Sequence, residues 1–206
     1  MIDLYAFATP NSIKVPIMLE EVGLDYRLIK VNIRSGEQKA PEFLALNPNG
    51  KVPVIVDLEG PDGKPVTITE SAAILIYLAE KTGKLIPQTS VDRIRMFEWM
   101  FFHASGLGPA FGNSGYFQKL APSPAPLAIE RFSNEAKRTL AVLDKRLGEV
   151  EYLAGSYSIA DIVNFGWIWR REFAGVDFSE TPNVARWYEA LEQRDAVKAA
   201  ISKLTA

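Results

Sequence analysis

The alternation of short β-rich runs with helical patterns is confined to residues 1–82. From residue 91 onward the apolar residues repeat with helical spacing, and no run predicts a strand. Strands and helices that alternate along a chain bury their apolar faces on a shared sheet, whereas helices alone pack against one another. The sequence therefore predicts an α/β domain over residues 1–82, a linker over residues 83–90 and an all-helical domain over residues 91–206.

The first domain is predicted to have the order β-α-β, then a long connection, then β-β-α. Its predicted strands cover residues 1–7, 26–33, 52–58 and 65–69, and its predicted helices cover residues 12–22 and 70–81. Glycine and proline between residues 59 and 63 indicate a hairpin. A β-α-β unit implies a parallel strand pair with a right-handed crossover, and the hairpin adds an antiparallel pair.

The sequence of the second domain predicts several helices. Residues 129–147 place apolar side chains at spacings of three and four, which is typical of a helix face packed on a core. Ser158 and Asp161 have the spacing of a capping box, and the helix that they open is apolar nearly all round. Gly106-Leu107-Gly108-Pro109 is predicted to break or kink a helix, and Asp195 is predicted to cap the last one.

Composition excludes several classes of function. Lys+Arg 23 against Asp+Glu 25 gives a net charge of −2, which lacks the basic excess of a nucleic-acid-binding domain. No apolar run approaches the roughly 18 residues of a membrane-spanning helix. The N-terminus lacks the basic and apolar regions of a signal peptide. We therefore expect a cytoplasmic protein that binds neither nucleic acid nor membranes.

The chain contains no cysteine and a single histidine, His103. The lack of cysteine removes disulfides, thiolate metal ligands and any protein thiol nucleophile. One histidine cannot supply both ligands of a motif such as H-E-x-x-H, and no metal is expected. If this protein carries out thiol chemistry, the thiol must come from a ligand.

The loop after the first predicted strand contains Thr9 and Asn11. In α/β sheets ligands bind beyond the carboxyl ends of strands, which is where this loop lies. Thr9 and Asn11 would direct hydroxyl and amide donors at an anion, and such donors favour a thiolate over a thiol. The alternative is that Asn11 or Ser12 simply caps the following helix.

Two pairs of residues flank the predicted hairpin. The proline of Val52-Pro53 either marks a strand start or edge, or forms a cis bond that leaves the Val52 backbone groups free for an extended ligand. Glu70-Ser71 opens a helix, whose N-terminus favours carboxylates, and Glu70 would accept from an ammonium group. The alternative for Ser71 is a plain N-cap. Together the pairs would hold an amino-acid-like end.

These features resemble the cytosolic glutathione transferases over essentially the whole chain. The matching segments are the N-terminal β-α-β pattern, Asn47-Pro48-Asn49-Gly50-Lys51-Val52-Pro53, Glu70-Ser71 with Ala73-Ile74-Leu75-Ile76-Tyr77-Leu78, and Ser158-Ile159-Ala160-Asp161. The resemblance implies a thioredoxin-like domain followed by a helical-bundle domain, and a homodimer. Further segments are similar to the Nu-class branch, namely Thr9-x-Asn11-x-x-Lys14, Tyr26-Arg27-Leu28-Ile29-Lys30-Val31, Pro41-Glu42-Phe43-Leu44 and Ala128-Ile129-Glu130-Arg131-Phe132.

The resemblance also implies roles for individual residues. Thr9 and Asn11 would flank the glutathione sulfur as the catalytic residues. Arg131 would reach glutathione from the helical domain. The implied glutathione-binding residues are Asn11, Lys14, Gln38, Val52, Pro53, Glu70, Ser71 and Arg131.

An activity follows from the same resemblance. It implies an enzyme that uses the thiols of one or two bound glutathione molecules to reduce small-molecule disulfides, and organic hydroperoxides, with weak conjugating activity. Two alternatives remain open. One is conventional conjugation of glutathione to an electrophile, and the other is a non-catalytic binding or regulatory protein with the same fold.

Overall fold

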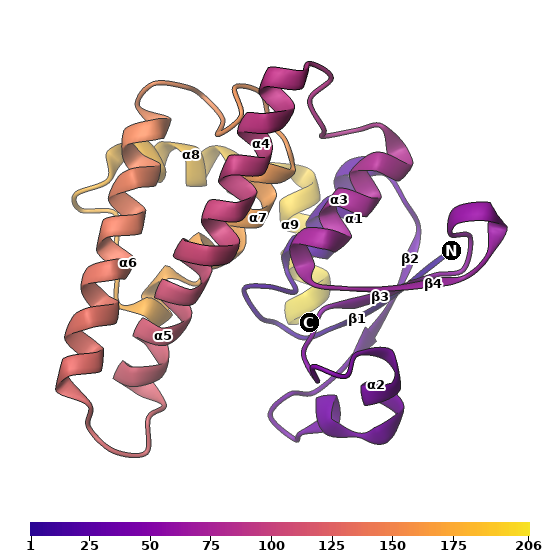
Figure 1. Ribbon diagram of the computed structural model, residues 1–206, viewed down its shortest axis with the longest axis horizontal. Coiled ribbons are helices and arrows are strands. Elements are labelled where there is room, and N and C mark those ends of the chain that lie inside the picture. The colour runs from indigo at the N-terminus through magenta and orange to yellow at the C-terminus, as the bar shows by residue number, and fades with distance from the viewer. The chain divides into compact units, whose positions relative to one another are not determined.

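The computed structural model describes residues 1–206 and divides into two compact units, Met1–Leu85 with Arg194–Ala206, and Ile86–Gln193. The first unit contains the only sheet, and the second is built from helices (Figure 1). The elements of the first unit are β1 (Ile2–Ala6), α1 (Lys14–Val22), β2 (Tyr26–Lys30), a 3₁₀ turn (Glu37–Lys39), α2 (Pro41–Leu46), β3 (Val54–Asp57), a 3₁₀ turn (Pro61–Gly63), β4 (Val66–Thr69), α3 (Ser71–Thr82) and α9 (Asp195–Thr205).

The strands form one mixed sheet in the order β2-β1-β3-β4. β1 pairs parallel with β2 and antiparallel with β3, which pairs antiparallel with β4. The predicted β-α-β and β-β-α order is therefore confirmed. Leu4 and Ile55 face each other across β1 and β3, and neither side chain is exposed. α1 and α3 lie side by side on one side of the sheet, and α2 lies on the other (Figure 1).

β2 ends at Lys30, earlier than its predicted end at residue 33. Asn32 ends the extended run because its side-chain oxygen accepts a hydrogen bond from the Arg34 N–H at 3.0 Å. Its backbone carbonyl also accepts from the Ser35 N–H at 3.2 Å. Asparagine favours turns of this kind. The chain then enters the 3₁₀ turn that carries Gln38.

α9 packs against α1 and belongs to the first unit, which corrects the predicted domain of residues 91–206. One face of α9 is buried, through Val197, Ala200 and Leu204. Arg194 donates to both carboxylate oxygens of Glu21, at 2.5 and 2.9 Å. Helical periodicity reveals an amphipathic face but does not identify its partner, so the sequence could not place this helix. The N-cap position is held by Arg194, and Asp195 is the first helical residue.

The second unit contains α4 (Ser90–Phe102), a π-helical segment (His103–Leu107), α5 (Gly108–Lys119), α6 (Pro126–Leu147), α7 (Ile159–Trp169), a 3₁₀ turn (Arg171–Ala174) and α8 (Pro182–Glu192). At the predicted break or kink, Gly106–Pro109, the chain forms a wider π-helical turn and continues through it into α5. Pro109 lies in the first turn of α5, where its missing N–H is tolerated. None of the helices combines the length and the apolar character that crossing a membrane requires.

α7 begins with the predicted capping box, which the structure contains in full. The Asp161 carboxylate accepts from the Ser158 N–H at 3.0 Å, the Leu153 N–H at 3.0 Å and the Trp187 indole N–H at 2.9 Å. Burial raises the pKa of Asp161 to about 6, against the opposing effect of these hydrogen bonds. Asp161 therefore joins the start of α7 to two other segments of the helical unit.

Candidate functional site

The strand register brings distant candidate residues to one end of the sheet. Tyr5 in β1 faces Val54 in β3, and Val54 faces Thr69 in β4. β1 therefore ends where β3 begins and β4 ends. The loop after β1, the Val52-Pro53 segment and the Glu70-Ser71 segment all adjoin this end, as does the chain that follows β2. We call it the loop end of the sheet.

Thr9 shapes the loop after β1. Its hydroxyl accepts from the Ser12 N–H at 3.1 Å and donates to the Ser12 hydroxyl at 3.0 Å. The Ile13 N–H donates to the Thr9 carbonyl at 3.1 Å. The hydroxyl proton of Thr9 is thus directed within the loop. The N-cap position of α1 is Ile13, and no side chain caps it, so neither Asn11 nor Ser12 has the capping role of the alternative interpretation.

Lys14 connects this loop to the start of α3. Its Nζ donates to Asn11 Oδ1 at 2.7 Å and to Ser71 Oγ at 3.2 Å. The side chain has no exposed surface, although α1 begins at this residue. Burial lowers the pKa of the Lys14 ammonium to about 7, and the charge of Glu70 opposes this shift.

The burial of Lys14 was not predicted from the sequence. A signal for it exists, because Ile17 and Met18, one turn further along α1, are also buried. Residues at spacings of three and four share a helix face. Lys14 therefore lies on the apolar face of its helix, a position where lysine is rare unless it has partners.

Glu70 holds an unusual backbone conformation at the start of α3. Its φ is +66°, a region that residues other than glycine rarely adopt. Its carbonyl accepts from the Ile74 N–H at 2.9 Å, while its side chain is exposed. Strain of this kind concentrates at ligand-binding positions. The helix N-terminus favours a carboxylate, and the Glu70 carboxylate suits an ammonium group.

Val52-Pro53 and Gln38 add backbone and amide groups near the loop end. The Val52-Pro53 peptide bond is cis, and Val52 is half-buried against the cluster formed by Val31, Phe43 and Val54. Gln38 Nε2 donates to the Ile33 carbonyl at 3.4 Å. Gln38 Oε1 is buried without a protein donor, so it is an acceptor suited to a ligand N–H.

Arg131 lies on α6, in the second unit, and its guanidinium is largely exposed. It forms an ion pair with Glu135 at 3.4 Å, and Arg138 holds the same carboxylate through two hydrogen bonds. The Arg138 and Arg131 hydrogen bonds lower the pKa of Glu135 to about 2. The role of Arg131 toward glutathione stays a prediction.

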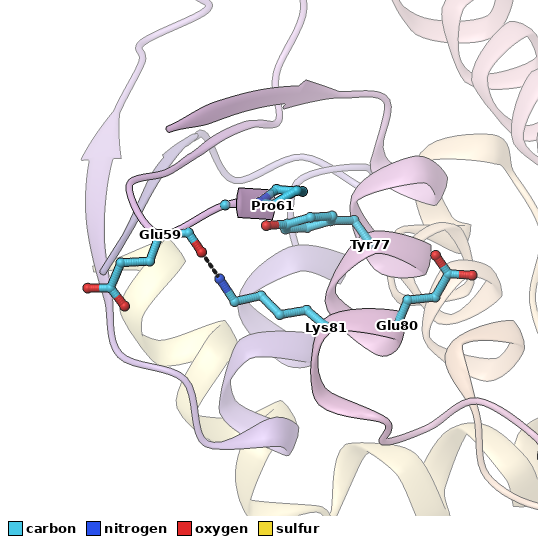
Figure 2. Close-up of a pocket in the computed structure, with 6 residues that line it drawn as sticks. Glu59, Pro61, Tyr77, Glu80 and Lys81 are labelled. Atoms are coloured by element: carbon cyan, nitrogen blue, oxygen red, sulfur yellow. Dashed lines mark hydrogen bonds between the residues drawn. The ribbon is translucent and has the colours of Figure 1, made fainter. Parts of the chain in front are cut away.

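A separate hollow of about 350 Å³ lies at the opposite end of β3 and β4 (Figure 2). Lys81 Nζ donates to the Glu59 carbonyl at 2.6 Å, and the Tyr77 ring lies beside Pro61 in Figure 2. Tyr77 also donates to Asp57 at 2.7 Å. The residues that line this hollow are Glu59, Gly60, Pro61, Tyr77, Glu80 and Lys81, and no predicted site residue is among them.

Comparison with known proteins gives consistent matches along the chain. Two family models match, the glutathione S-transferase N-terminal domain over residues 8–81 and the C-terminal domain over residues 126–190. Disulfide-bond oxidoreductase YfcG of Escherichia coli (strain K12) is 44% identical over 98% of this chain and 95% of its own.

Two solved structures extend the comparison to three dimensions. A glutathione transferase family member from Pseudomonas fluorescens, with two glutathione bound, aligns with a TM-score of 0.92 and 42% identity, over 97% of this chain and 92% of its own. A glutathione transferase from Pseudomonas putida, with one glutathione disulfide bound per subunit, aligns with a TM-score of 0.91 and 39% identity, over 97% and 90%.

The chain belongs to the glutathione S-transferase family. Its first unit is the thioredoxin-like domain of that family and its second is the helical domain, as the resemblance implied. Among its relatives, the chain is similar to proteins named as disulfide-bond oxidoreductases, YfcG and the 37% identical YghU.

Proposed function

We propose that this protein uses the thiols of bound glutathione to reduce small-molecule disulfides. One glutathione thiolate attacks a sulfur of the disulfide, which forms a mixed disulfide and releases one thiol. The thiolate of a second glutathione attacks the glutathione sulfur of the mixed disulfide and releases the second thiol. Two glutathione molecules leave as glutathione disulfide, so no protein cysteine is needed, and the chain has none.

The observation that carries this proposal is the connection between Asn11 and Ser71 through Lys14. It supports a site in which one of the two glutathione molecules spans the loop end of the sheet. The γ-glutamyl ammonium would pair with Glu70, and its carboxylate would bind the Ser71 hydroxyl and the start of α3. The sulfur would lie at the Asn11 amide, whose N–H groups favour the thiolate.

The other predicted residues have chemistry suited to the rest of glutathione. The Val52 backbone, fixed before Pro53, would pair with the peptide in the manner of an added strand. Gln38 Oε1 would accept an N–H from the ligand. Thr9 would hold the loop in shape through Ser12, and Arg131 would bind a carboxylate from the helical unit.

The names of the relatives, and the molecules bound in their structures, support the same reaction. The Escherichia coli relative is named a disulfide-bond oxidoreductase, and the two Pseudomonas structures contain two glutathione molecules or one glutathione disulfide. Two glutathione molecules are the reductants of the proposed reaction, and glutathione disulfide is its product.

The direct test compares three assays of the purified protein. Hydroxyethyl disulfide with glutathione measures disulfide reduction, an organic hydroperoxide measures peroxidase activity, and 1-chloro-2,4-dinitrobenzene measures conjugation. We expect disulfide reduction to be the fastest of the three. Conjugation that exceeds disulfide reduction would instead indicate a conventional transferase, and glutathione binding without any turnover would indicate a binding protein.

We also propose that the protein works in the cytoplasm as a homodimer. The cytosol maintains a reduced glutathione pool, which the reaction consumes. α4 presents three exposed apolar side chains, Val91, Ile94 and Phe101, at 66%, 58% and 66% exposure. Exposed apolar surface of this kind is typical of a subunit contact.

A further inference from the structure

Lys14 is among the largest fully buried side chains of the protein. Burying an amine costs free energy unless it is paired and hydrogen-bonded. Lys14 donates to Asn11, in the loop after β1, and to Ser71, at the start of α3, and both are candidate glutathione-binding residues. A buried lysine in this position therefore affects the orientation of the candidate site residues as well as the packing of the fold.

The first consequence concerns the direction of the Asn11 side chain. Lys14 Nζ donates to Oδ1, and an amide oxygen and nitrogen lie on opposite branches of the same planar group. Fixing Oδ1 toward the protein interior therefore turns Nδ2 away from Lys14. Asn11 is half-buried, and with Oδ1 held by Lys14 its N–H groups are left to donate to a ligand.

The second consequence concerns the Ser71 hydroxyl. Ser71 Oγ accepts from Lys14, and a hydroxyl that accepts one hydrogen bond keeps its own proton to donate. Ser71 is the first residue of α3, where the free N–H groups also point out of the helix. Because Lys14 occupies an oxygen of each side chain, the Asn11 amide N–H groups and the Ser71 hydroxyl proton are left to donate to two different parts of a ligand.

We propose that Lys14 is a positioning residue, which does not contact glutathione but orients the Asn11 amide and the Ser71 hydroxyl as donors to it. This inference rests on the proposed function, because it assumes that glutathione is the ligand. It revises the expectation that Lys14 itself belongs to the binding surface. Its effect on the ligand passes through Asn11 and Ser71.

The test is a mutant cycle in which ligand affinity and kcat are measured for each variant. Lys14→Met keeps an unbranched side chain of nearly the same length and removes the donor. We expect it to weaken glutathione binding about tenfold, since two oriented donors are lost, and to lower kcat for hydroxyethyl disulfide reduction as well. In an Asn11→Ala, Ser71→Ala background we expect Lys14→Met to change binding less than about twofold, because contacting residues are not additive.

Lys84→Met is the control. Lys84 is exposed, and its Nζ donates to the Val22 carbonyl at 2.8 Å, so it connects the C-terminal ends of α1 and α3, the ends away from Asn11 and Ser71. We expect its glutathione affinity to equal that of the wild type. An equal loss of affinity in both lysine variants would overturn the inference in favour of general helix packing.

A ligand-free measurement separates this inference from the proposed function. The side-chain amide signals of Asn11 in a ¹⁵N spectrum, assigned with Asn11→Ala, should shift or broaden in Lys14→Met and not in Lys84→Met. Unchanged Asn11 signals would overturn the inference even if glutathione binds. Wild-type protein that fails to bind glutathione would overturn the proposed function, and the role of Lys14 toward glutathione with it.

Should Lys14→Met unfold, Lys14→Gln supplies a second variant. Its amide retains a donor for Asn11 Oδ1, so we expect glutathione affinity between those of the wild type and of Asn11→Ala. A folded Lys14→Gln protein with affinity as low as Asn11→Ala combined with Ser71→Ala would overturn the inference.

Discussion

Asn11 combines an anchored oxygen with a nitrogen that has no protein acceptor. The anchor is Lys14, and the loop around it is closed by the hydrogen bonds between Thr9 and Ser12. A donor held in place before the reaction stabilises a developing anion at little reorganisation cost. At the scale of single residues, the site therefore depends on which polar atoms already form hydrogen bonds within the protein and which are left for a ligand.

Replacement of Asn11 tests whether its amide is a preorganised donor to the thiolate. We expect Asn11→Ala to lower kcat for hydroxyethyl disulfide reduction about a hundredfold, the usual effect of losing one preorganised donor. Asn11 caps no helix but accepts a hydrogen bond from the buried Lys14, so the melting temperature should fall as well, and the rate is compared per folded molecule. The pH dependence of the rate should move upward, since the bound thiol ionises less readily. A wild-type pH profile would contradict this prediction.

Lys14 should make stability depend on pH. Its pKa is about 7 in the folded protein, because burial outweighs the charge of Glu70, against a usual value of 10.5. Between these values the unfolded chain binds more protons, so the free energy of unfolding rises with pH. From pH 7.5 to 9.5 we expect the wild type to gain up to about 2–3 kcal/mol relative to Lys14→Met. Urea unfolding measures this, and parallel pH curves would argue against it.

Arg131 offers a comparison with its neighbour Arg138. Both guanidinium groups bind Glu135 and both are exposed. We expect Arg131→Ala to weaken glutathione binding severalfold while Arg138→Ala does not, with both melting temperatures near the wild-type value because surface changes cost about 0.5 kcal/mol or less. Calorimetric titration would measure this. Equal affinities in the two variants would remove Arg131 from the site.

Elements of the sheet domain could be predicted from the sequence because their signals are local. Short β-rich runs located its strands, and in the helical unit the capping box of Ser158 and Asp161 located the start of α7. The sequence could not show that the chain stays helical through Gly106–Pro109, because glycine and proline are compatible both with a π-helical turn and with a break in the helix. The burial of Lys14 and the partner of α9 also escaped prediction, because both depend on contacts between elements far apart in sequence.

The capping box of α7 gives a prediction at the scale of an element. In Asp161→Asn, an amide group would face N–H donors from Ser158, Leu153 and Trp187 with only one acceptor oxygen. We expect the free energy of unfolding to fall by about 1–3 kcal/mol, the cost of a buried donor left without an acceptor. Asp177→Asn, at an exposed carboxylate, is the control and should change stability little. Equal stabilities of the two variants would contradict the prediction.

The whole molecule is expected to be a dimer through the exposed apolar face of α4 and the rim of the first domain. Sedimentation at micromolar concentration should give twice the mass of the chain. Ile94→Glu with Phe101→Glu should shift it toward monomer, because two charges would be buried in the contact. Leu127→Glu, at an 81% exposed position on α6, is the control. A monomeric wild type would count against the dimer.

The return of α9 to the first unit has a consequence for how the protein is made. Strands and helices of that unit leave the ribosome early, and α1 can pack against α3, but α9 reaches α1 only after the whole helical unit has been synthesised. Domains usually fold in the order in which they emerge, at about 5–20 residues per second. Here the helical unit emerges complete while the glutathione-binding unit still lacks its last helix. We therefore expect the N-terminal unit to be the last part of a nascent chain to resist proteolysis.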